Sequence, residues 1–198
     1  MVALVGVSPV VARAQASVEI GPLFGYYHPA GHFDLLTGSI DGPHTPSELS
    51  AYAFGAEIVG RFSPTIGVRA EAFNASQSGG QHSVATPGAG IITTQGTSVS
   101  VASAQALFDF VSDSSRNFWL SAGPGLVHHG GAAYARGGSP TDLAAGFGSG
   151  AEFNFHKSWR FTAGVSGFYY FLDARSQETG TQIDLLFRVG FVWAPSRR

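Results

Sequence analysis

The chain has 198 residues, which suits one domain, and its net charge of −2 provides no basic field for a nucleic acid. It contains no cysteine, which excludes disulfides, thiolate metal sites and a cysteine nucleophile. Charged residues make up only 12% of the chain, about half the share of a soluble domain, whereas glycine occurs 27 times and phenylalanine 16 times. This composition indicates a protein whose exterior faces lipid and whose interior is crowded.

The first residues differ from the rest of the chain. Residues 2–11 form an apolar run, and Ala14-Gln15-Ala16 matches the small-x-small pattern of a cleavage site. We therefore predict that residues 1–16 are a signal peptide and that the mature bacterial protein begins at Ser17. No basic segment precedes the apolar run, which indicates that the signal peptide is truncated. The alternative is that the apolar run forms a short buried strand or helix.

From residue 17 onward, apolar side chains alternate with small or polar ones at a period of two, which is typical of β-strands. The sequence has no stretch of about 18 apolar residues without a charge, so a transmembrane helix is excluded. Segments rich in turn residues divide the pattern into eight strands. In chain order, the predicted strands span residues 17–27, 51–62, 66–73, 98–111, 118–128, 142–155, 159–172 and 181–193.

The connections between these strands alternate in length. Those after the second, fourth and sixth strands are short and cover residues 63–65, 112–117 and 156–158. The other four are longer, are rich in glycine, serine, proline and histidine, and cover residues 28–50, 74–97, 129–141 and 173–180. Short turns at one end and long loops at the other are the pattern of an outer-membrane barrel.

The charged residues inside the predicted strands share one parity, opposite to the bulky apolar side chains. They are Glu19, Glu57, Arg61, Arg69, Glu71, Asp109, Glu152, Arg160, Asp184 and Arg188. Hydrocarbon cannot solvate a charge, whereas a barrel interior can pair opposite charges, so we predict that these residues form a charge network in the lumen. Because an eight-stranded barrel is just wide enough for side chains to fill, we expect the network to plug the lumen; a pore or gate is the alternative.

A soluble, lipocalin-like barrel is the alternative fold, with apolar side chains inside and polar ones outside. Here the polar face carries mainly glycine, serine and charge, as a narrow filled lumen requires. Aromatic residues also gather near both strand ends, as in the interfacial girdles of membrane barrels. They are Phe62, Phe110, Phe118, Phe155, Trp159, Phe191 and Trp193 near the short turns, and Tyr26, Tyr52 and Tyr169 near the long loops. We predict an all-β fold: a closed, antiparallel, up-and-down transmembrane β-barrel of eight strands.

Three segments resemble the small OmpA/OmpX-type barrels of the bacterial outer-membrane β-barrel domain family. They are Val18-Glu19-Ile20-Gly21-Pro22, Leu120-Ser121-Ala122-Gly123-Pro124-Gly125 and Gly148-Ser149-Gly150-Ala151-Glu152-Phe153. The apolar alternation that ends in Phe191 and Trp193 is similar to the C-terminal signal read by the barrel-assembly machinery. The resemblance implies a monomeric barrel surrounded by outer-membrane lipid and lipopolysaccharide. We expect the barrel to cover residues 17–194 and residues 195–198 to form a periplasmic tail. An even number of strands returns the chain to its starting side, so we expect both termini in the periplasm.

The histidines are the candidates for chemistry, because His28, His32, His44, His82, His128 and His129 all fall in or beside the predicted long loops. A metal site or a lipid-modifying hydrolase would need fixed short spacings or a serine soon after a histidine, and His128-His129-Gly130-Gly131 lacks that serine. We therefore predict no catalytic, metal or cofactor residues. The expected function is a structural or surface-interaction protein that displays four extracellular loops, whose partner the sequence does not reveal. The alternatives are a lipid-modifying enzyme and a narrow channel.

Overall fold

The computed structural model describes residues 17–30, 50–77, 83–86, 90–93, 97–112, 115–131, 141–172 and 180–194. The predicted signal peptide and the tail at residues 195–198 lie outside the described residues, as do His32, His44 and His82.

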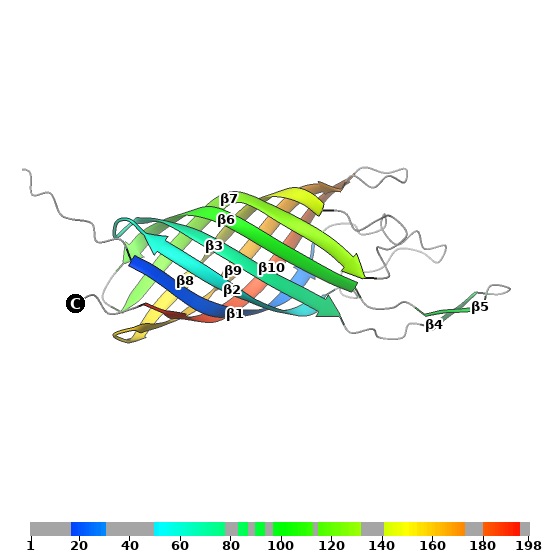
Figure 1. Cartoon of the computed structure of the whole chain (residues 1–198), viewed down its shortest axis with the longest axis horizontal. Helices are drawn as coiled ribbons and strands as arrows, with labels where there is room; N and C mark the ends of the chain where they lie inside the picture. The colour runs from blue at the N-terminus through cyan, green and yellow to red at the C-terminus, as the bar shows by residue number, and fades with distance from the viewer. Residues whose placement is uncertain are drawn as a thin grey trace, which may run out of the picture.

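Eight strands close into one antiparallel barrel, and the predicted up-and-down topology is confirmed (Figure 1). The order around the ring is β1-β10-β9-β8-β7-β6-β3-β2, so strands that follow one another in the barrel are neighbours and the first strand pairs with the last. The barrel strands are β1 (Ser17–Pro29), β2 (Ala51–Arg61), β3 (Ile66–Gln77), β6 (Thr97–Ser112), β7 (Arg116–Gly131), β8 (Thr141–His156), β9 (Trp159–Leu172) and β10 (Gly180–Trp193).

Two features differ from the predicted elements. The connection between β3 and β6, expected to be a loop, contains β4 (Ser83–Thr86) and β5 (Gly90–Thr93), which pair in a separate two-stranded sheet. The strands β3 and β7 are also longer than predicted, because their polar outer segments continue the ladder with β6. His129 therefore lies in β7, as His128 does, and not in the third loop.

The exterior of the barrel is apolar and its interior holds the charges. On β2, Phe54 is 62% exposed whereas the adjacent Ala53 is fully buried, and the same alternation runs through the other barrel strands. On β10, Leu186 is fully buried whereas Leu185 lies on the outer face. Such an exterior suits lipid and not water, because large apolar side chains cover the outer face while the charged side chains of the strands are gathered inside. Among the described residues no helix is long and apolar enough to cross a bilayer.

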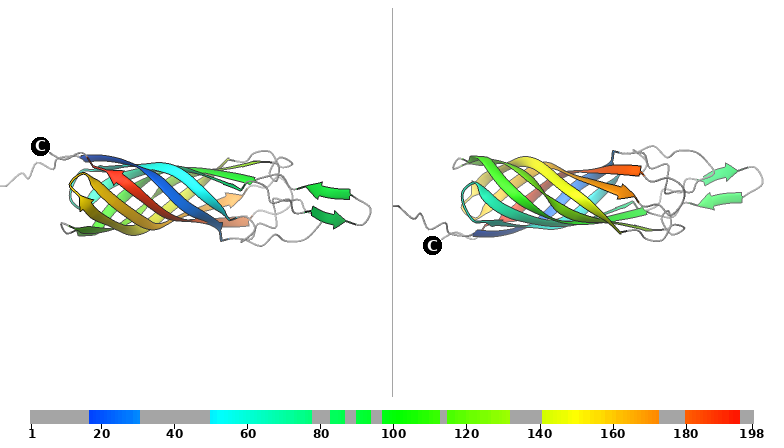
Figure 2. Two further views of the ribbon diagram at one scale, coloured as in Figure 1. Left: turned by 90° about the horizontal axis from the view of Figure 1, so that it is seen from below. Right: turned by 90° about the horizontal axis from the view of Figure 1, so that it is seen from above.

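The two ends of the barrel differ, and Figures 1 and 2 show both ends of the described chain beside the short turns. The turn between β2 and β3 is closed by Ser63, whose Oγ accepts hydrogen bonds from the backbone N–H groups of Thr65 (3.2 Å) and Ile66 (2.9 Å). The turn between β8 and β9 consists of Lys157 and Ser158. The long connections leave the opposite end of the barrel.

Candidate functional site: a charged plug in the lumen

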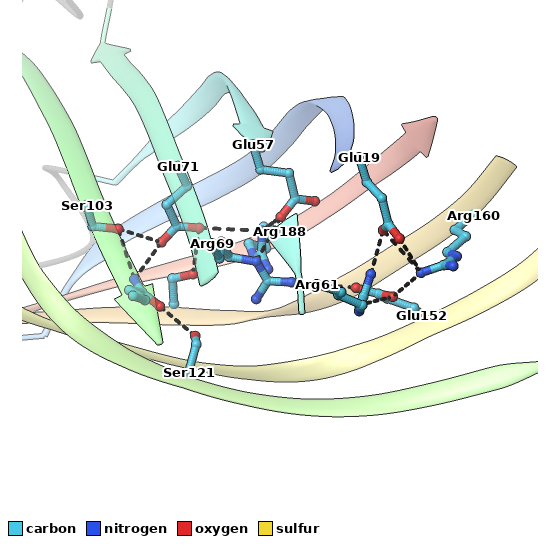
Figure 3. Close-up of polar contacts among 12 residues, drawn as sticks. Glu19, Glu57, Arg61, Arg69, Glu71, Ser103, Ser121, Glu152, Arg160 and Arg188 are labelled. Carbon is cyan, nitrogen blue, oxygen red and sulfur yellow. Dashed lines mark hydrogen bonds and ion pairs between the residues drawn. The ribbon is translucent and has the colours of Figure 1, made fainter. Parts of the chain in front are cut away.

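Arg61 is the centre of the first half of the plug. It is the last residue of β2, and its inward parity directs the guanidinium into the lumen (Figure 3). All three of its nitrogens donate to carboxylates on other strands: Nε to Asp109 Oδ2 (2.8 Å), Nη1 to Glu19 Oε2 (2.5 Å) and Nη2 to Glu152 Oε2 (2.7 Å). One arginine thereby joins β1, β2, β6 and β8 at the short-turn end.

A second half lies deeper in the lumen, around Glu57. Its Oε2 lies 2.8 Å from Nη1 of Arg188 and 3.1 Å from Nε of Arg69. The Nη1 atom of Arg188 also lies 3.4 Å from Glu71 Oε2. Glu152 connects the two halves, because its Oε1 lies 3.6 Å from Arg69 Nη2 while its Oε2 binds Arg61.

Arg160 closes the network at the rim. Its Nη1 lies 2.9 Å from Glu19 Oε1 and 3.5 Å from Glu152 Oε2, and its side chain keeps 27% of its surface exposed. The other charged side chains of the network are almost fully buried. Nine of the ten residues singled out in the sequence thus lie in one chain of ion pairs.

Trp119 of β7 adds the remaining strand to this arrangement. The guanidinium carbon of Arg69 lies 3.7 Å from the centre of its ring and that of Arg188 lies 4.7 Å from it, so the fully buried indole makes cation–π contacts with both. Glycines on β8 and β9 make room for the indole: a Cβ atom on Gly150 would lie 2.6 Å from Trp119 Cζ2, and one on Gly164 would lie 2.9 Å from it. The glycine content of β8 and β9 therefore serves the packing of the plug.

Neutral side chains satisfy the inner carboxylate of Glu71. Its Oε1 accepts hydrogen bonds from Gln105 Nε2 (3.0 Å) and Ser103 Oγ (3.3 Å), and its Oε2 accepts one from Ser166 Oγ (3.3 Å). Ser121 donates in turn to Gln105 Oε1. These neutral residues were not predicted as part of the site, although they share the inward parity of the charged ones.

Asp184 does not belong to this network. It faces the lumen as expected, but it lies near the long-loop end of β10, where it accepts hydrogen bonds from Tyr170 Oη (2.7 Å) and Gln182 Nε2 (3.0 Å). The Tyr170 hydroxyl also lies 3.0 Å from Nε2 of His129, whose Nδ1 is 3.7 Å from Asp142. Parity decides which face a residue occupies, but not how high in the barrel it lies, so Asp184 was wrongly grouped with the other charges.

An apolar layer separates the plug from this second polar cluster. It includes the buried side chains of Leu23, Phe73, Phe168 and Leu186, and the rings of Phe73 and Phe168 are 5.7 Å apart. The interior is thus charged near the short turns, apolar further up, and polar again near the long loops. Side chains occupy each of these levels.

The described histidines make local or cross-strand contacts, and Nδ1 of His156 accepts the backbone N–H of Ser158 in the turn after β8 (3.4 Å). Nδ1 of His28 lies 2.8 Å from Ser50 Oγ, and Nδ1 of His128 lies 2.9 Å from Thr141 Oγ1. His129 is fully buried in the lumen, which corrects its placement in the third predicted loop. In the described part of the chain, no group of three or more His, Asp or Glu residues is placed to hold a metal ion.

Comparison with known proteins identifies the fold. Neither a protein-family model nor a curated protein sequence matches the chain. Among solved structures, the chain is similar to Neisserial surface protein A (12% identity, TM-score 0.59, 90% of this chain and 97% of that chain covered). It is also similar to the outer membrane protein OprG from Pseudomonas aeruginosa (13% identity, TM-score 0.59, 92% of this chain and 97% of that chain covered). A third similar structure is Ail, the attachment invasion locus protein of Yersinia pestis (13% identity, TM-score 0.53, 90% of this chain and 97% of that chain covered).

The fold and the interior together define the class. A closed eight-stranded barrel with an apolar exterior and its charges paired inside is an integral membrane β-barrel of the outer-membrane type. The particular fold is the one shared by the surface protein, OprG and Ail structures, over nine-tenths of this chain.

Proposed function

We propose that the chain is a structural or surface-interaction protein of the bacterial outer membrane, a plugged barrel that holds four long loops on the cell surface. The observation that carries this proposal is the filled lumen. The network around Arg61 and Glu57 joins seven strands, Trp119 supplies the eighth, and the apolar layer covers it on the loop side. A wall tied together in this way is a rigid support for loops.

Two of the similar structures agree with such a role. One is described as a surface protein and another as an attachment invasion locus protein. The role proposed here is non-enzymatic. We further propose that the barrel is a monomer surrounded by lipid and lipopolysaccharide, is inserted by the barrel-assembly machinery, and has both termini in the periplasm.

The plugged lumen is tested by conductance across planar bilayers, after a heat-modifiable gel shift has shown that the protein is folded. We expect no stepwise conductance from the wild type. Steady single-channel steps from the folded wild type would replace the proposed role with that of a narrow channel.

Orientation is tested by cysteine labelling on whole cells. Ser83 lies in the connection between β3 and β6, and Thr65 is exposed in the short turn between β2 and β3. An impermeant thiol reagent should label the Ser83→Cys variant but not the Thr65→Cys variant until the cells are opened. The reverse pattern would invert the proposed topology.

A further inference from the structure

The outer wall of the barrel has a groove at the junction of its first and last strands. The groove has a volume of about 590 Å³ and is lined by Ile20, Gly21 and Pro22 of β1, Gly55 and Ala56 of β2, and the indoles of Trp159 and Trp193. Its lining is almost entirely apolar, and Ile20, Trp159 and Trp193 are all exposed on the outer face. The groove therefore opens toward the space that lipid occupies.

The step Gly21-Pro22 explains why the wall is hollow here. The ladder between β1 and β10 pairs Ile20 with Trp193 and then resumes only at Leu23 with Gly190. Proline has no N–H to donate, so the ladder is interrupted at Pro22, while pairing with β2 continues on the other side. Gly21 has inward parity, and a Cβ atom on it would lie 2.0 Å from the carbonyl oxygen of Phe191, so the backbones of β1 and β10 approach closely here and only Pro22 faces outward.

The floor on β2 is equally short of side-chain bulk. Gly55 has inward parity and adds only backbone to the floor, and the next residue, Ala56, contributes only a methyl group to the outer face. Small residues on β1 and β2, beside the paired indoles of β10 and β9, leave a slot with an apolar floor and an aromatic wall on one side.

The groove reaches the short-turn rim of the barrel. Trp193 ends β10 and pairs with Trp159, which begins β9. Indoles prefer the level of the lipid headgroups. Lys157, the single lysine of the chain, is exposed in the turn just before Trp159. From the slot toward the rim, the wall therefore presents an apolar surface, then the indole pair, then a cation. A phospholipid has the same order: an acyl chain, a glycerol region and a phosphate.

We propose that this groove binds one glycerophospholipid of the periplasmic leaflet, with an acyl chain in the slot beside Pro22 and its phosphate near Lys157. The choice of leaflet rests on the orientation proposed above, which puts the short turns in the periplasm. A phosphate is bound by the ammonium group as a point charge. The apolar slot supplies the larger part of the binding free energy. The bound acyl chain exchanges contacts with mobile lipid chains for van der Waals contacts with fixed side chains.

The test uses the full chain reconstituted in vesicles of phosphatidylethanolamine and phosphatidylglycerol, released into mild detergent and weighed by native mass spectrometry. We expect the wild type to retain one phospholipid. Ala56→Trp, which fills the slot, should lower the retained fraction at least about tenfold, equivalent to 1.4 kcal/mol. The matched control is Ala122→Trp, which adds the same bulk to the lipid face of β7, opposite β1 in the ring; it should retain the lipid as the wild type does.

Lys157→Gln provides an independent measurement, because it leaves the slot intact and changes only an exposed turn. We expect this variant to retain less phosphatidylglycerol relative to phosphatidylethanolamine than the wild type does. An unchanged ratio would overturn the assignment of the phosphate. Equal lipid retention by Ala56→Trp and Ala122→Trp, or a wild type without lipid, would overturn the site. Two results would assign the groove to another occupant. The protein extracted from native membranes could carry bound lipopolysaccharide, or it could be a dimer that Ala56→Trp dissociates.

Failure of the site is separable from failure of the proposed function. Brominated phospholipids should quench the fluorescence of Trp159 and Trp193 in every folded variant, while Trp119 in the lumen stays unquenched. Quenching without retained lipid would remove only the groove proposal. No quenching at all would remove the membrane assignment and the groove together.

Discussion

Replacing Arg61 with methionine should be among the most damaging single changes in this barrel. The guanidinium serves three carboxylates at once, and two of them, Glu19 and Glu152, keep Arg160 as a partner. Asp109 is the exception: it is 1% exposed and, among the residues that the structure describes, Arg61 is the one cation that contacts it. The variant therefore leaves one carboxylate buried without a counter-charge.

The magnitude follows from that stranded charge. Removing one partner of a buried ion pair costs about 3–5 kcal/mol of unfolding free energy, because the remaining charge is neither hydrated nor paired. Arg160→Met is the matched control, since the same substitution at a partly exposed rim position is expected to cost about 0–1 kcal/mol. Changing both partners, as Arg61→Met with Asp109→Leu, should recover much of the loss, because no unpaired charge remains on that branch.

The assay is equilibrium unfolding in urea of the protein folded into phospholipid vesicles, followed by tryptophan fluorescence and by the heat-modifiable gel shift. The expected order of stability is wild type, then Arg160→Met, then the double variant, then Arg61→Met. If Arg61→Met unfolded at the same urea concentration as Arg160→Met, the network around Arg61 would contribute no more than a surface pair, and the account of the plug would be refuted.

Two further predictions concern the packing of the lumen. Gly150→Ala should destabilise the barrel by about 1–3 kcal/mol, because its Cβ would lie 2.3 Å from the backbone oxygen of Ala163. The control Gly60→Ala should be nearly neutral, because its Cβ would meet only Val68, at 3.5 Å. Equal unfolding midpoints for the two variants would contradict this prediction. Phe168→Ala should lower the free energy of unfolding by about 3–5 kcal/mol, because it opens a cavity in the apolar layer. The control is Phe171→Ala on the exterior, where lipid refills the space. An equal loss of stability in the two variants would show that the layer is not packed.

The alternation of side chains explains how much of the fold was predictable. In a membrane barrel a one-residue shift would move every charge of a strand into lipid, so parity is constrained at each position, and the inward placement of the charged residues, such as Glu57 and Arg188, followed from it. The ring itself followed from the alternation of short and long connections. Both signals are local in the sequence, and each is repeated in every strand.

The pairing partners inside the lumen and the full lengths of β3 and β7 could not be predicted, because they depend on how separate strands align with one another. The pairing of Arg61 with Glu152 requires the register of all the intervening strands, and that of Asp184 with Tyr170 depends on height along the barrel axis. The polar outer ends of β3 and β7 resemble loop segments in composition, and only their ladders with β6 extend them as strands. His129 was misassigned for that reason.

The central claim, that the apolar face of the wall looks at lipid, is tested most directly on two neighbouring residues of β10. Leu185 lies on the outer face and Leu186 is fully buried in the lumen. An environment-sensitive fluorophore attached at position 185 should report hydrocarbon and be quenched by lipid-borne bromine, whereas the same probe at position 186 should be shielded. Quenching at 186 with none at 185 would contradict the membrane assignment of the barrel and the placement of its charges together.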